Sequence, residues 1–150
     1  MKILAFLLLT ISLVACKTYS EEDKVSFNKE ITKIAKQKKW DITFSPSGLG
    51  IQLMNEGEGE ELIQRGSIVK LSYKGQLKNG KVFDQTEPGK PFESEIKGLI
   101  GGFQEALLGQ KKGAKLRLII PPHLGYGTDK LDKIPANSIL IFELEVVDFV

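Results

Sequence analysis

Residues 69–84, VKLSYKGQLKNGKVFD, decide the fold of this chain. Apolar and polar side chains alternate through residues 69–77, so one face of the expected strand carries Val69, Leu71 and Tyr73. Asn79-Gly80 follows this run, and the pair suits the positive φ angles of a type I′ turn. We therefore expect a β-hairpin whose second strand begins at Lys81.

The segments on either side predict further strands and one short helix. Alternating apolar residues mark strands at 49–54, 115–120 and 139–149. A helix is expected from Gly98 to Gly109, because its apolar residues have helical spacing. Residues 43–48 are typical of a loop in their Pro, Gly and Ser content. Several antiparallel strands with one helix predict an α+β domain, in which a curved sheet wraps around the helix.

A second helix is expected before this domain, from Ser20 to about Trp40. Ser20 suits the N-cap position, and the acidic residues after it suit the first turn. The apolar stripe of this helix is narrow and includes Ile31 and Ile34. The narrow stripe favours a spacer that packs weakly on the domain. A helix that mediates dimerisation or grips client proteins is the alternative.

The N-terminus has the features of an export signal. Lys2 precedes the apolar run 3–15, which is shorter than the roughly 20 residues of a membrane-spanning helix. An ordinary signal peptide or an anchor helix would share these features. Leu13-Val14-Ala15-Cys16, however, resembles the lipobox of bacterial lipoproteins. That resemblance implies removal of residues 1–15, acylation of Cys16 and anchoring of the exported protein to a bacterial membrane. In enterobacterial lipoproteins an Asp after the acylated cysteine is the signal for retention in the inner membrane. Lys17 stands there instead, so the resemblance is compatible with an outer-membrane location facing the periplasm in a cell that has an outer membrane.

Composition excludes several classes of function. The chain has 21 Lys and Arg against 19 Asp and Glu, without the basic bias of nucleic-acid binders. Cys16 is its only cysteine, which excludes a disulfide framework. His123 is its only histidine, so the common zinc patterns are absent from the sequence. We therefore expect no nucleic-acid partner, no metal and no cofactor.

Seven short motifs carry a family resemblance. In chain order they are residues 69–77, 79–84, 90–92, 98–103, 113–115, 124–127 and 134–142. In this order and spacing they resemble the FKBP-type peptidyl-prolyl cis–trans isomerases, over about residues 47–150. The resemblance implies a curved antiparallel sheet around one short α-helix, preceded by an N-terminal helical extension. The expected domains are a signal peptide (1–15), a lipidated N-terminus with a helical linker (16–46) and an isomerase domain (47–150).

The implied reaction is rotation about the peptide bond before a proline. Such bonds isomerise over tens to hundreds of seconds, because rotation breaks the resonance of the C–N bond. No nucleophile or metal is required. An apolar pocket can hold the proline ring, remove water from the amide and favour the twisted bond. Lowering the barrier by about 1.4 kcal/mol accelerates rotation tenfold.

The resemblance also assigns roles to individual residues. Asp84, Tyr126 and Phe142 are the expected catalytic residues, and Asp84 is expected to accept a hydrogen bond from the hydroxyl of Tyr73. The Ile100 N–H and the Tyr126 hydroxyl would donate to substrate carbonyls. The expected substrate-binding residues are apolar or aromatic, with Phe103 as the floor of the pocket and Ile134 at its rim; they are Tyr73, Phe83, Phe92, Leu99, Ile100, Phe103 and Ile134.

Plainer interpretations compete with these roles. Aromatic residues at alternating strand positions are usually core, and for Phe92 and Phe142 alone the core and the pocket are equally favoured. Asp84 alone could be a solvated carboxylate at a strand end. The chain also departs from the family pattern, because Ser94 stands where a second aromatic residue is usual and Lys133 where an apolar residue is usual. We therefore expect moderate activity and weak affinity for the macrolide inhibitors of the family.

The sequence thus predicts an exported, lipid-anchored prolyl isomerase that assists the folding of proline-containing polypeptides. Its membrane contact would be made through Cys16, and the sequence leaves its oligomeric state open. The alternative is a non-catalytic chaperone or a module that binds proline-containing segments on the same fold. A purely structural surface lipoprotein would not account for the complete pocket pattern.

Overall fold

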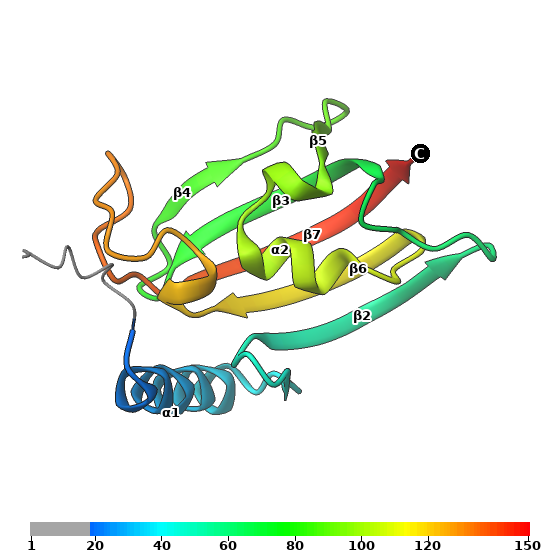
Figure 1. The fold of residues 1–150 in the computed structure, drawn as a ribbon. Coiled ribbons are helices and arrows are strands. Elements are labelled where there is room, and N and C mark those ends of the chain that lie inside the picture. The colour runs from blue at the N-terminus through cyan, green and yellow to red at the C-terminus, as the bar shows by residue number, and fades with distance from the viewer. Residues whose placement is uncertain (1–18) are drawn as a thin grey trace, which may run out of the picture.

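The computed structural model describes residues 19–150, so the predicted signal peptide and Cys16 lie outside the described residues. The described part forms one antiparallel sheet of seven strands with two α-helices and two 3-10 helices (Figure 1). The elements in chain order are α1 (Glu21–Lys38), β1 (Thr43–Phe44), β2 (Gly50–Glu58), β3 (Ile68–Leu77), β4 (Val82–Gln85), β5 (Phe92–Glu95), η1 (Ile96–Gly98), α2 (Gly101–Leu107), β6 (Lys112–Ile120), η2 (Pro122–Leu124) and β7 (Leu140–Phe149). This arrangement confirms the predicted α+β class. Within residues 19–150 no helix is long and apolar enough to cross a membrane.

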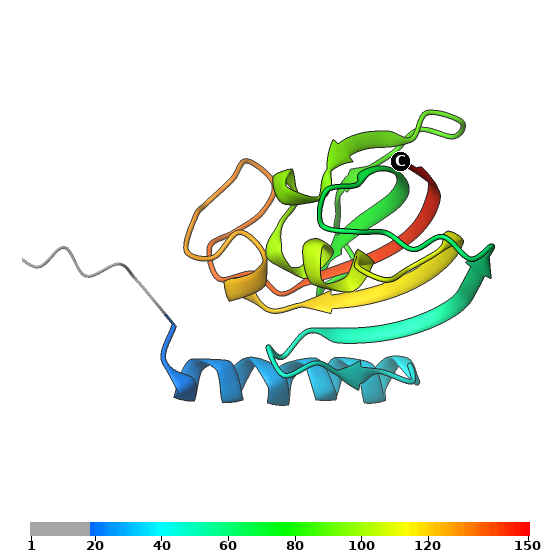
Figure 2. The same ribbon diagram turned by 45° about the vertical axis from the view of Figure 1, so that its right-hand side comes forward.

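The sheet curves around α2, with α1 outside the curve beside β2 (Figure 2). Its strand order is β1-β2-β6-β7-β3-β4, and β5 pairs with β3 as well. The predicted alternation holds, because Val69 and Leu71 of β3 are fully buried between the sheet and α2 together with Leu118 of β6. Gly102 of α2 lies against Ile120, where an added Cβ would stand 2.8 Å from the isoleucine side chain. The small residue therefore lets α2 approach the sheet closely.

The helix α1 packs more firmly on the domain than the spacer interpretation predicts. Ile31 is completely buried and forms a second apolar cluster with Ile119 and Ile141 on the outer face of the sheet. Burial of one such side chain contributes about 1.5–3 kcal/mol. Trp40 extends the contact, since the guanidinium of Arg117 lies 4.2 Å from its ring centroid. A narrow stripe suffices here because it meets isoleucines on the sheet, whose outward positions the sequence alone did not reveal.

The N-terminus of α1 agrees with the sequence analysis. The Ser20 hydroxyl accepts a hydrogen bond from the backbone of Asp23 at 3.1 Å, and the Asp23 carboxylate accepts one from the backbone of Ser20 at 2.9 Å. These reciprocal bonds form a capping box, which satisfies amide groups that would otherwise lack partners at the helix start. The predicted start of the helix at Ser20 is therefore confirmed.

The turn of the 69–84 hairpin differs from the prediction. Among the described non-glycine residues only Lys39 and Asn137 have positive φ, so Asn79 does not adopt a type I′ conformation. Gly80 has φ +86°, and its N–H donates to the carbonyl of Leu77 at 2.8 Å. A three-residue loop with glycine in the left-handed region closes the hairpin instead. The Asn79 side chain accepts from the N–H of Lys81 at 3.0 Å, which uses its polar group without a positive φ.

Two short strands, β1 and β5, are not predicted by the sequence pattern. β5 consists of mostly polar residues, and its residues Glu95 to Phe92 pair with Ile68 to Leu71 of β3. β1 forms in the expected loop because Thr43 and Phe44 pair with the start of β2. Both strands depend on hydrogen bonds to a neighbour rather than on apolar alternation, so periodicity did not reveal them.

Candidate active site

Three aromatic rings meet between the sheet and α2. The ring centroids of Phe103 and Phe142 are 4.7 Å apart, and the ring of Tyr73 lies 6.1 Å from the first and 5.9 Å from the second. All three contacts are edge-to-face, an arrangement that aromatic quadrupoles favour. Phe103 and Phe142 are each only 4% exposed, so they form the base of the cluster.

The edges of the cluster come from two further aromatic residues. Phe83 of β4 packs on Phe142 at 5.4 Å, and Phe92 of β5 packs on Tyr73 at 6.1 Å. Phe83 is buried, whereas Phe92 is 43% exposed. Phe92 therefore lies at the open side of the cluster and not in the core, whereas Phe142 is both a core residue and a member of the cluster.

Gly75, which the sequence analysis did not select, makes room for the rings. It pairs with Phe142 of β7 on one side and with Asp84 of β4 on the other. A Cβ at this position would stand 2.6 Å from the ring of Phe142 and 2.7 Å from that of Phe83. The detectable signal was a glycine inside an alternating strand, which often marks a close approach of other groups.

Asp84 and Tyr73 form the polar contact that the sequence analysis expected. The Tyr73 hydroxyl donates to Oδ2 of Asp84 at 2.6 Å. Burial first, and then the bond to Asp84 and its charge, raise the pKa of Tyr73 above its ordinary value. The tyrosine therefore remains a hydrogen-bond donor throughout the physiological pH range and holds the carboxylate beside the rings.

Tyr126 lies on the loop that follows η2, on the same side as Asp84. Burial and the charge of Asp84 raise the pKa of Tyr126, which keeps its hydroxyl protonated. Tyr126 is 37% exposed, while Ile134 farther along the loop is buried in the main core. Ile134, the expected rim residue, is thus a core residue in this structure, and its part in substrate binding stays a prediction.

Leu99 and Ile100 connect η1 to α2 and complete the group of predicted site residues. Both are half-buried and pack against the core cluster that contains Phe103. Within residues 19–150 the backbone N–H of Ile100 has no hydrogen-bond acceptor. An extended ligand could therefore use it as a donor. The structure thus brings the predicted residues of β3, β4, β7, α2 and the 122–138 loop to one region.

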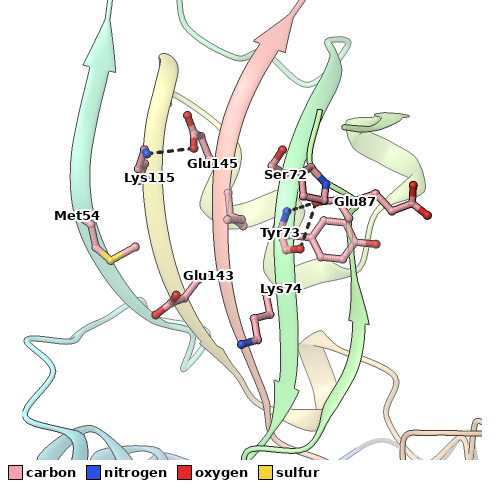
Figure 3. A pocket seen from close by; sticks show the side chains of 11 residues that line it. Met54, Ser72, Tyr73, Lys74, Glu87, Lys115, Glu143 and Glu145 are labelled. Atoms are coloured by element: carbon pink, nitrogen blue, oxygen red, sulfur yellow. Dashed lines mark hydrogen bonds and ion pairs between the residues drawn. The ribbon is translucent and has the colours of Figure 1, made fainter. Parts of the chain in front are cut away.

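The opposite face of the sheet carries a shallow depression of about 380 Å³ (Figure 3). Met54 lies at one side of it, and Lys115 and Glu145 form an ion pair of 3.1 Å within it. Both partners are well exposed, so the pair contributes about 0–1 kcal/mol. This depression has the character of a solvated, charged sheet face and contains none of the aromatic cluster except Tyr73. Within residues 19–150 no group of three or more His, Cys, Asp or Glu is placed to hold a metal ion.

Comparison with known protein families shows to which family the chain belongs. Residues 59–147 match the family model described as FKBP-type peptidyl-prolyl cis-trans isomerase. The chain belongs to this family. The match covers more than half of the chain and includes all the predicted site residues except the lipidation site Cys16, which lies outside the match.

Curated proteins and a solved structure agree with this membership. The chain is 45% identical over 108 residues to "FKBP-type peptidyl-prolyl cis-trans isomerase FkpA" of Buchnera aphidicola subsp. Schizaphis graminum, which covers 71% of this chain and 43% of that protein. It is 37% identical over 143 residues to a "Probable FKBP-type peptidyl-prolyl cis-trans isomerase" of Haemophilus influenzae, which covers 94% of this chain and 58% of that protein.

The solved structure is that of FkpA from Escherichia coli, with a TM-score of 0.72 and 33% sequence identity. The alignment covers 86% of this chain and 62% of that one. This chain therefore spans only about half the length of the curated relatives that it matches.

Proposed function

We propose that this protein is a peptidyl-prolyl cis–trans isomerase that acts through the aromatic cluster. The observation that best supports this proposal is that the rings of Tyr73, Phe103 and Phe142 pack together, next to the hydrogen bond between Tyr73 and Asp84. The proline ring of a substrate would rest on Phe103, where water is excluded from the preceding amide. A twisted amide loses its conjugation, so an apolar environment stabilises it relative to the planar, more strongly solvated ground state.

The polar groups at the edge of the cluster have complementary parts in this proposal. The Ile100 N–H, which has no acceptor within residues 19–150, and the hydroxyl of Tyr126 would donate to substrate carbonyls and fix the chain on either side of the proline. Asp84 would act electrostatically on the rotating amide, in an orientation set by Tyr73. No proton transfer or covalent intermediate is required, because rotation breaks only the resonance of the C–N bond.

The test is the rate of cis-to-trans isomerisation of short Xaa-Pro peptides, with Asp84→Val and Phe142→Leu as variants. We expect kcat/KM to fall about tenfold or more in each, which corresponds to about 1.4 kcal/mol of lost transition-state stabilisation. The matched control is Glu145→Gln on the opposite face, which should leave the rate unchanged. Two folded variants with the wild-type rate would contradict the assignment of the pocket. A rapamycin-type macrolide should inhibit the wild type weakly, because Ser94 stands where the family usually has an aromatic residue and Lys133 where it usually has an apolar one.

We further propose that the protein is exported and anchored through a lipid on Cys16, and that its substrates are exported polypeptides. The residues Leu13-Val14-Ala15-Cys16 support this proposal. Expression in a bacterial host followed by membrane fractionation and mass spectrometry tests it. A mature N-terminus at Cys16 that carries acyl chains is expected, and Cys16→Ser should release the protein from the membrane. A processed but unmodified cysteine would contradict the proposal and favour an ordinary signal peptide.

A chaperone or binding module is the second candidate, and two exposed apolar residues favour it, one at the edge of the cluster and one on the loop after Tyr126. Phe92 is 43% exposed, and Leu131 on the loop beyond Tyr126 is 41% exposed. Such residues can hold unfolded segments without catalysis. Suppression of client aggregation that persists in Asp84→Val, together with an absence of isomerase activity in the wild type, would favour this candidate.

A further inference from the structure

Gln104 on α2 holds the backbone on both sides of Ile100. Its side-chain Nε2 donates to the carbonyl of Leu99 at 2.7 Å and lies 3.4 Å from the carbonyl of Lys97. Its backbone N–H donates to the carbonyl of Ile100 at 3.1 Å. Both side-chain partners are carbonyl oxygens, which can only accept, so the amide of Gln104 must present its nitrogen to them.

The bond to Leu99 fixes the direction of the Ile100 N–H. The Leu99 carbonyl and the Ile100 N–H belong to the same peptide unit, and no described peptide bond is cis. In a trans peptide these two groups point in opposite directions within one plane. When Gln104 holds the carbonyl, the N–H is therefore directed away from Gln104, and this is the N–H that has no acceptor within residues 19–150.

Within the described residues 19–150, the bond from Gln104 is the only hydrogen bond made by this peptide unit itself. Leu99 has φ −89° and ψ 162°, and Ile100 has φ −61° and ψ 151°, so both are extended residues between η1 and α2. Neither residue belongs to a strand whose neighbour could hold the peptide plane. A donor that is already oriented before the ligand arrives avoids the ordering cost that a mobile one adds to binding.

We propose that Gln104 is a positioning residue, which orients the Ile100 N–H toward a carbonyl of the bound Xaa-Pro peptide. This inference rests on the proposed isomerase function of the same site. Gln104 itself does not touch the substrate in this arrangement. Gln104 therefore contributes to peptide binding, which stabilises the ground state and the transition state equally. It does not contribute to the rotation step itself.

The experiment compares the wild type with Gln104→Met in the full chain, using the p-nitroanilide of Ala-Leu-Pro-Phe as substrate. Methionine has a similar length but no donor. We expect KM to rise roughly fivefold and kcat to change by less than about twofold, the pattern of lost uniform binding. The matched control is Gln110→Met, since Gln110 also donates its side-chain amide to a backbone carbonyl, that of Ala106, at 3.1 Å. This control should retain the wild-type KM.

A second measurement on the wild type makes the test independent of the folding of any variant. In an amide NMR spectrum, addition of the peptide should move the Ile100 proton downfield, and in folded Gln104→Met this movement should shrink. Two outcomes would overturn the role of Gln104 and leave the isomerase function standing. In one, the wild type is active but its Ile100 signal does not move when the peptide is added. In the other, the wild type is active and Gln104→Met and Gln110→Met have equal KM values. A folded wild type that does not accelerate isomerisation would overturn the proposed function and this inference with it.

Discussion

Gly75 is the residue at which the backbone and the aromatic cluster come closest. Its backbone φ is not in the left-handed region, so an added methyl group would suffer from lack of space and not from backbone strain. The space is occupied by two rings, Phe142 and Phe83, and neither can retreat without moving core neighbours. The shape of the site therefore depends on a residue that carries no side chain.

Gly75→Ala tests this dependence. We expect overpacking to lower the free energy of unfolding by about 1–3 kcal/mol and kcat/KM to fall about tenfold, because the rings must shift. Urea unfolding and peptide isomerisation are the measurements. Gly66→Ala is the matched control, since beyond its two chain neighbours no other residue has an atom within 4 Å of its added Cβ. Similar effects of the two substitutions would show that the contact with the rings is not the cause.

Tyr73 should make the free energy of unfolding depend on pH in the alkaline range. Its pKa is raised above the ordinary 10.0 in the folded protein, so above about pH 10 the folded chain retains a proton that the unfolded chain loses. The free energy of unfolding should therefore decline as pH rises beyond 10. In Tyr73→Phe this decline should be less steep, as measured by urea unfolding between pH 8 and 11. Parallel pH profiles of the two proteins would contradict the half-buried, hydrogen-bonded state of the Tyr73 hydroxyl.

The residues of the aromatic cluster were largely predictable from the sequence, whereas the residues that position the site were not. Phe103, Phe142 and Asp84 stand in recognisable motifs, and the expected bond between Tyr73 and Asp84 is present. Their catalytic roles stay predictions. Gln104 was missed because its function depends on the direction of one peptide plane, which no pattern of residue types reveals.

At the level of elements, α1 is the largest departure from expectation. A thin apolar stripe predicted a weakly packed spacer, but Ile31 is completely buried against the outer face of the sheet. The stripe could not show this, because burial depends on the partner surface as well as on the helix. The main strands were predictable because they alternate, and strand β2 extends to Glu58 because its pairing with β6 continues past an irregularity between Leu53 and Asn55.

Ile31→Ala measures the contact between α1 and the sheet. We expect a loss of about 2–5 kcal/mol in the free energy of unfolding, because the substitution removes a buried side chain and leaves a cavity. The isomerase rate should remain at the wild-type level, since Ile31 lies on the face opposite the aromatic cluster. Val25→Ala on the same helix is the control: Val25 is 52% exposed, and its substitution should cost less than about 0.5 kcal/mol.

For the whole molecule, the question is whether residues 47–150 form an independent domain. The predicted domain boundary between residues 46 and 47 stays a prediction. The packing of α1 and the pairing of β1 with β2 argue that residues 19–46 belong to the folded unit. Removal of residues 1–46 would expose the outer apolar cluster on β6 and β7. We expect a lower unfolding temperature and increased binding of the dye ANS, in comparison with a chain that lacks only residues 1–18. Equal unfolding temperatures would instead support an independent domain and a helical linker.

The central strands β6 and β7 separate two apolar clusters that lie on opposite faces of the sheet. Leu118 and Phe142 face α2, while their neighbours Ile119 and Ile141 face α1, and all four are almost completely buried. Backbone amides between two covered faces open only with the whole fold, whereas amides of the exposed loop 128–133 open locally. Deuterium exchange should therefore be slowest at the floor of the cluster and fastest beside Tyr126. A bound peptide would then lie between the rigid strands β6 and β7 on one side and the more mobile loop 128–133 on the other, and the loop could adjust to the peptide.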